Sequence, residues 1–282
     1  MNNLLKTALK DIQYGPHHLN FLDLWLTSTE EPSPLVVWFH GGGFWYGDKA
    51  EEMPDPQLFL DAGISLASVN YRLCPEAAFP EPMLDGARAI QFLKHHAQGW
   101  NINPGKIAAA GNSAGGHIAL WLAFHNDLAD PASLDPISWQ STRIAAVGGE
   151  DAQTILDPRA LRKMFGRVRE NFAIDFFGFT SGEIDSPRAY GIYEEASPIN
   201  HASDNAPPAF LIYNGDMAQI TQDMDWSLVI HHPLFGECLR QKLDSLGIEC
   251  KTRYKGDSKG LTAAEYRDEM IQFFARHFGM QD

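Results

Sequence analysis

The sequence predicts an α/β fold built on a mostly parallel β-sheet with helices on both faces. Short apolar runs alternate with helical stretches along most of the 282 residues. This alternation is the pattern of repeated strand–helix–strand units. The apolar runs are also continuous rather than alternately polar, which indicates strands that are buried on both faces.

The order of elements follows from these runs. A helix is predicted over Glu81–His96, which opens with acids and a proline, and another after Ser113. The opening stretch HHLNFLDLWL is extended and predicts antiparallel strands at one edge of the sheet. The chain shows no repeat and no linker, so we expect residues 1–282 to form a single domain. The segments predicted as strands are Leu35–His40, Ile64–Tyr71, Ile107–Gly111, Ile144–Gly148, Ala209–Asn214 and Glu249–Tyr254.

One segment breaks this alternation. Residues 157–198 are dense in aromatic side chains, are interrupted by Gly and Pro, and are too long for an ordinary connection. They form either a cap over a substrate pocket or an insertion that covers a hydrophobic edge. We favour the cap, because long insertions at the ligand end of such sheets often carry function. Some of its aromatic side chains should then line a cavity with Phe44 and Trp45; the candidates are Phe165, Phe172, Phe176, Phe177, Phe179 and Tyr190.

The amino-acid composition argues against several classes of binding partner. The net charge of −14 argues against nucleic acid and against an anionic membrane surface, since both attract proteins with an excess of Lys and Arg. The three cysteines show neither metal-binding nor C-x-x-C spacing. The chain shows no signal-peptide pattern and no long apolar run, so we expect a cytoplasmic protein. The sequence does not indicate an oligomeric state.

Two motifs point to nucleophilic chemistry. The first, Gly111-Asn112-Ser113-Ala114-Gly115, is a G-x-S-x-G between a predicted strand and a predicted helix. Such a turn exposes the serine hydroxyl, and the N–H of Ala114 at the helix start can face a developing oxyanion. By itself, a serine at this position is more often a helix cap.

The second motif, His40-Gly41-Gly42-Gly43, follows the buried strand VVWF. Consecutive glycines expose backbone N–H groups, which can donate two hydrogen bonds to a tetrahedral oxygen. A flexible turn is the alternative. The order of the two motifs along the chain favours an acyl-transfer site.

Together, HGGGF, NYRLCPEAAFPEPMLDGARAIQFL and INPGKIAAAGNSAGGHIAL resemble the hormone-sensitive-lipase-like and acetyl-esterase branch of the α/β-hydrolase fold. The resemblance covers the first half of the chain and implies an eight-stranded sheet. It implies Ser113 as nucleophile and an oxyanion hole formed by Gly41, Gly42 and Ala114. It further implies support from Tyr71-Arg72 and Glu76, hydrolysis of short acyl esters, and no cofactor or metal. Asn112 stands where this branch more often has Asp.

The second half departs from that pattern. The acid expected after the strand AFLIYNG is Asp216, which comes one or two positions early. The loop after the last strand should carry the base, but it reads Asp257-Ser258-Lys259-Gly260 and contains no histidine. We do not expect Lys259 to act as the base, because beside Asp257 it should be solvated and protonated.

A histidine pair offers another base. His231 and His232 lie in the region after the acid-bearing strand, and Asp216 or Asp151 can orient an imidazole there. Of the two we favour His232, because the following proline fixes its backbone. The competing interpretation is that the pair only begins a helix. The other histidines considered, His117, His201 and His277, should not reach Ser113.

Two functions follow. The first is a serine carboxylic-ester hydrolase for small-molecule esters, such as acetylated carbohydrates, with Ser113, His232 and Asp216 as an atypical triad. The second is a catalytically weakened hydrolase-fold protein that binds a small ligand in the same pocket. The fold alone does not decide between them, so the site must.

Overall fold

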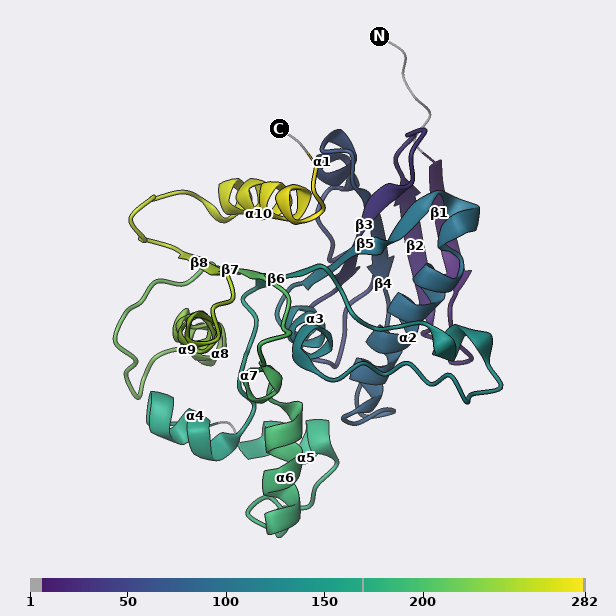
Figure 1. Ribbon diagram of the computed structural model, residues 1–282. Helices are drawn as coiled ribbons and strands as arrows, with labels where there is room; N and C mark the ends of the chain where they lie inside the picture. Colours follow the sequence, from purple (N-terminus) through teal and green to yellow (C-terminus); the bar gives the residue numbers. More distant parts are fainter. Residues whose placement is uncertain (1–6, 169, 281–282) are drawn as a thin grey trace.

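A computed structural model describes residues 7–168 and 170–280, and its eight strands form one sheet in the order β1-β2-β4-β3-β5-β6-β7-β8 (Figure 1). The β1–β2 and β2–β4 pairs are antiparallel, and all the other pairs are parallel. The predicted eight-stranded, mostly parallel sheet is therefore confirmed. The strands are β1 (Thr7–Gln13), β2 (Phe21–Leu26), β3 (Ser33–Phe39), β4 (Ser65–Val69), β5 (Ile102–Gly111), β6 (Ala146–Glu150), β7 (Ala209–Tyr213) and β8 (Cys250–Tyr254).

The continuous apolarity of the central strands has the predicted cause. Every residue of β3 is buried, and its side chains divide between two hydrophobic clusters. Val37 and Phe39 belong to one cluster, while Val36 and Trp38 belong to the other, on the opposite face. Both faces of the sheet therefore need helices to cover them.

Helices pack on each face, as Figure 1 shows. Helices α1 and α10 cover one face, where Phe59 and Phe274 join the cluster that contains Trp38. Helices α2, α3 and α9 cover the other face and lead towards the insertion. The helices are α1 (Pro56–Asp61), α2 (Glu81–His95), α3 (Ala114–Phe124), α4 (Pro158–Phe165), α5 (Glu170–Phe177), α6 (Pro187–Ala196), α7 (Pro198–His201), α8 (Trp226–Ile230), α9 (Leu234–Ser245) and α10 (Ala263–His277).

The aromatic segment forms helices α4 to α7 between β6 and β7. Asp157 caps α4 through the N–H of Arg159, and Ser186 caps α6 through the N–H of Ala189. In Figure 1 these helices lie beyond α3 and α8, on the side of the sheet away from α10. Phe176 stacks on Phe44 with ring centroids 4.2 Å apart, so the insertion packs directly on the glycine motif.

The predicted strands and the helix Glu81–His96 agree with the structure to within a few residues at most ends, and β5 begins earlier, at Ile102. Strand β1 lies before the stretch in which the edge strands were predicted, although its pairing with β2 is antiparallel as expected. Within the described residues, no helix has the length and apolarity required to cross a bilayer.

Candidate active site

Ser113 lies at a sharp turn between β5 and α3. Its φ of 48° and ψ of −114° fall in a region that side-chain-bearing residues rarely adopt, as expected for a strained nucleophile turn. The Ser113 N–H donates to the carbonyl oxygen of Glu150 at 2.7 Å, which fixes the turn to β6. At Gly115, a Cβ would lie 2.1 Å from the carbonyl oxygen of Phe39, so only glycine allows α3 to approach β3 this closely.

The Ser113 hydroxyl contacts an imidazole. Its Oγ lies 2.9 Å from Nε2 of His231, within the range of a strong hydrogen bond. His231 follows α8 directly, and the side chain of Asp225 caps that helix through the N–H of Ser227. The side-chain amide of Gln153 donates to the carbonyl oxygen of Ile230 at 2.7 Å and so holds the residue before His231.

The structure corrects the choice between the two neighbouring histidines. The Nε2 of His232 lies 2.9 Å from the carbonyl oxygen of Ala218, and its Nδ1 accepts the N–H of Leu234 at 3.1 Å. The imidazole of His232 therefore lies against the first turn of α9, where it accepts the N–H of the first residue of that helix. His231, not His232, therefore meets Ser113.

The two candidate acids are placed differently. Asp216 is exposed, and its carboxylate accepts the N–H of Ala218 at 3.1 Å; among the described residues it forms no hydrogen bond or ion pair with His231 or His232. Asp151 is buried at the end of β6 with a φ of 50°. Its two carboxylate oxygens accept the backbone N–H of Asn214 at 2.8 Å and the Asn214 side-chain amide at 2.6 Å. Of the two, Asp151 is the carboxylate whose charge acts on His231.

The environment of His231 favours the neutral form of its imidazole. Burial lowers the pKa of His231 below its ordinary value, because the charged form loses hydration. The negative charge of Asp151 acts in the opposite direction and raises that pKa. Burial has the larger effect, so His231 can accept a proton over a wider pH range than an exposed histidine.

The glycine motif borders the same cavity as Ser113. Gly42 and Gly43 both line it. Gly42 has a φ of 96°, and a Cβ there would lie 1.8 Å from the carbonyl oxygen of Tyr46, so no other residue fits. The Tyr71 hydroxyl lies 2.8 Å from the carbonyl oxygen of His40 and 3.1 Å from that of Gly41, and so holds the start of the loop. Whether the N–H groups of Gly41, Gly42 and Ala114 converge on one point stays a prediction.

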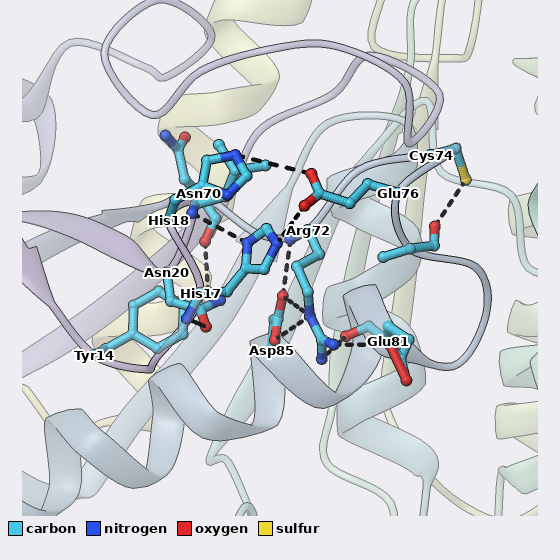
Figure 2. Close-up of polar contacts among 12 residues, drawn as sticks. Tyr14, His17, His18, Asn20, Asn70, Arg72, Cys74, Glu76, Glu81 and Asp85 are labelled. Atoms are coloured by element: carbon cyan, nitrogen blue, oxygen red, sulfur yellow. Dashed lines mark hydrogen bonds and ion pairs between the residues drawn. The ribbon is translucent and has the colours of Figure 1, made fainter.

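Figure 2 shows where the other expected supports lie. The Arg72 guanidinium binds Asp85 at 2.9 Å and Glu81 at 2.8 Å, and so joins the segment after β4 to α2. Glu76 instead faces the surface and contacts the ring of His17 at 3.0 Å. Tyr71 therefore supports the glycine loop directly. The contacts of Arg72 instead hold α2, and those of Glu76 hold His17.

A cavity of about 680 Å³ opens over Ser113. Aromatic and aliphatic side chains form most of its wall, with Glu52, Arg167 and Asp175 as the charged exceptions. The prediction that cap aromatics line a cavity with Phe44 and Trp45 is confirmed for Phe165 and Phe172. The remaining cap aromatics pack elsewhere: Phe176, Phe177 and Phe179 are buried in the core, and Tyr190 stacks under Arg159.

The other residues considered as the base form hydrogen bonds or ion pairs with groups other than Ser113. Lys259, in the loop after β8, forms an ion pair with Glu269. His117 is buried with Nδ1 2.7 Å from the carbonyl oxygen of Gln153, and burial lowers its pKa to about 4. His201 and His277 contact Glu195 and Glu249. Sequence reasoning missed Gln153 altogether, because no motif marks a glutamine that supports the end of a helix 77 residues away.

Comparisons with known proteins agree with this architecture. The chain is 26% identical to the esterase LipQ of Mycobacterium tuberculosis over 209 residues, which cover 72% of this chain and 47% of that protein. The chain thus spans less than half of the length of this relative. A truncated carbohydrate esterase from gut microbiota superposes with a TM-score of 0.77 at 19% identity, covering 99% of each chain.

An esterase of Thermogutta terrifontis, solved with propionate bound, superposes with a TM-score of 0.67 at 21% identity, covering 96% of this chain and 94% of that one. At these identities the two structures show the fold. The BD-FAE family matches residues 22–223, from the second strand to the loop after β7. The chain therefore belongs to the BD-FAE family and has the α/β-hydrolase fold of carboxylesterases.

Proposed function

We propose that this protein is a serine carboxylic-ester hydrolase whose nucleophile is Ser113 and whose base is His231. The observation that carries the proposal is the 2.9 Å contact between Ser113 Oγ and His231 Nε2. A serine hydroxyl is a weak nucleophile unless a neighbouring base removes its proton, and an imidazole at this distance meets that requirement.

In the acylation step, Ser113 Oγ attacks the ester carbonyl carbon while its proton moves to His231 Nε2. The carbonyl oxygen becomes an oxyanion, which the N–H groups of the glycine loop and of Ala114 stabilise. Ala114 is the first residue of α3, so its N–H points out of the helix start and carries the positive end of the helix dipole.

The tetrahedral intermediate then collapses, and the imidazolium of His231 returns its proton to the departing alkoxide. A water molecule attacks the acyl-enzyme with His231 as base, which releases the carboxylic acid and regenerates the Ser113 hydroxyl. Asp151 stabilises the imidazolium through its charge, because it favours the protonated form of His231.

The proposed groups come from unusual positions along the chain. The acid follows β6 and the base follows β7, whereas the family resemblance places them after β7 and after β8. The β6–β7 pair is parallel, so residues that follow these two strands emerge at the same edge of the sheet. The shift therefore keeps both groups beside Ser113.

The cavity supports a small ester substrate. Its apolar wall, including Ile155, Leu161 and Trp226, suits an acyl chain or an alcohol with an apolar body. Hydrolysis of p-nitrophenyl esters of increasing acyl length tests the function directly. Absence of hydrolysis with every member of the series, together with ligand binding in the cavity, would favour the ligand-binding alternative.

The pH profile should reflect the neutral base. We expect kcat/KM to rise with pH as His231 loses its proton and then to level off, because only the neutral imidazole accepts the Ser113 proton. Since burial lowers the pKa of His231, the midpoint should lie below the value of about 6.5 typical of an exposed histidine. A midpoint above that value would contradict the placement of His231.

Asp151 can be tested against the acid that the sequence favoured. Asp151→Asn should lower kcat/KM by about 100-fold, less than the ~10⁴-fold seen where the acid bonds the imidazole directly. The acidic midpoint should also move to lower pH, because the charge that raises the pKa of His231 is gone. Asp216→Asn is the matched control and should change neither quantity. If Asp216→Asn lowers kcat/KM and shifts the midpoint while Asp151→Asn does neither, Asp216 is the acid and Asp151 is not.

A further inference from the structure

A second group of chemically active side chains lies where the cap meets the far end of the nucleophile helix. His125 follows α3, Glu195 belongs to α6, and His201 ends α7. One ligand atom from each of the three lies within 4.8 Å of the others. The histidine side chains are only 16% exposed, while that of Glu195 is 48% exposed.

The hydrogen bonds of His125 constrain what its contact with Glu195 can be. Its Nδ1 lies 3.0 Å from the carbonyl oxygen of Asn126, which only accepts hydrogen bonds, so Nδ1 carries the ring proton. Its Nε2 then faces the Glu195 carboxylate at 3.0 Å. In a neutral ring that nitrogen presents a lone pair to another acceptor, so this contact needs either a second proton or a metal ion.

The surroundings favour ligation. A carbonyl on the opposite ring nitrogen is the arrangement that orients metal-binding histidines, and the ring of His125 is stacked on Trp121 at 4.0 Å. His201 Nε2 lies 2.6 Å from the carbonyl oxygen of Glu195 and 4.0 Å from its carboxylate. A carbonyl oxygen only accepts, so His201 Nε2 carries a proton, which it must give up to bind a metal. The carbonyl also accepts the Trp121 indole N–H at 3.0 Å, so it keeps a partner if His201 binds a metal.

A second cluster of two histidines and a glutamate, at His17, His18 and Glu76, differs in its hydrogen bonds (Figure 2). There, His17 Nδ1 accepts the N–H of Leu19 at 3.2 Å, so the proton lies on Nε2, which donates to Glu76 at 3.0 Å. The contact is complete without a cation. The His125–Glu195 contact, by contrast, needs a second proton or a metal ion, although both clusters contain two histidines and one glutamate.

We propose that His125, Glu195 and His201 form a binding site for a transition-metal ion such as Zn²⁺. Two imidazoles and a carboxylate are a ligand set that Zn²⁺ accepts, with water in the fourth position. Zinc ligands lie about 3.3 Å apart in a tetrahedral site, so the contact of His125 with Glu195 needs little change and His201 needs to move closer. Because α3 is about 16 Å long, the ion acts on the cap junction rather than on Ser113.

Titration of the EDTA-treated, dialysed full chain with ZnCl₂ by calorimetry tests the site. We expect one Zn²⁺ per chain, with affinity reduced at least about 100-fold in His125→Ala and in His201→Ala. His17→Ala is the matched control and should bind as the unaltered protein does. At about 100 times Kd, Zn²⁺ should raise Tm by about 5 °C. No binding, or binding lost in His17→Ala but kept in His125→Ala, would overturn the proposal.

Co²⁺ provides a readout that does not depend on the stability of the alanine variants. The bound ion should give the visible absorption of a four- or five-coordinate site, and Glu195→Gln should abolish or shift that absorption. Circular dichroism checks that each variant is folded. An identical Co²⁺ spectrum in folded Glu195→Gln and unaltered protein would exclude Glu195 as a ligand and would overturn the site as proposed.

Discussion

Ser113→Ala is expected to reduce ester hydrolysis on the order of 10⁶-fold in kcat, as in serine hydrolases that lose their nucleophile. The substitution removes the atom that we propose forms the acyl bond, while the proposed oxyanion donors and the cavity remain. Hydrolysis of p-nitrophenyl acetate measures the loss, and any residual rate reports stabilisation of the oxyanion alone.

Folding does not complicate this variant. Ser113 is held in its turn by its backbone N–H bond to Glu150, which alanine retains. The positive φ is as strained for alanine as for serine, so Tm should change little. Unchanged hydrolysis in a folded Ser113→Ala protein would show that the activity arises elsewhere.

His231→Ala is expected to lower kcat by about 10⁴-fold or more, because Ser113 loses the group that accepts its proton. His232→Ala is the matched control, being the next residue and also an imidazole. It should leave kcat within a few-fold, since its ring contacts the Ala218 carbonyl and the Leu234 N–H rather than the nucleophile. Its effect should appear in Tm instead, because α9 loses a capping acceptor.

The opposite ranking of the two variants would restore His232 as the base. Equal and small effects of both would show that Ser113 reacts without an imidazole. Exogenous imidazole adds a second readout, because a small base can occupy the space left in His231→Ala and restore part of the rate. No such rescue is expected in Ser113→Ala.

Much of the fold was predictable because its signals are local. Buried parallel strands such as β3 are continuous apolar runs, and the G-x-S-x-G motif requires a strand before it and a helix after it. Strand β1 escaped prediction because its sequence, TALKDIQ, mixes polar and apolar residues and gains its structure from pairing with β2.

The site was less predictable because it depends on tertiary placement. The sequence indicated the pair His231 and His232, and His231 is the one that contacts Ser113. Which of two adjacent side chains does so depends on where α8 ends and α9 begins. The ring of His232 instead lies against the first turn of α9. Asp151 was an alternative acid, and only its position after β6 brings its charge close to His231.

The rate at which a fluorophosphonate probe labels Ser113 reports directly on the pairing of Ser113 with His231, because it needs no knowledge of the natural substrate. The probe reacts with a serine whose proton is removed by a neighbouring base, and mass spectrometry of the labelled peptide identifies the site. We expect one label on Ser113, at a rate that falls by orders of magnitude in His231→Ala and stays unchanged in His232→Ala. Labelling of Ser113 at the same rate in His231→Ala would contradict that pairing.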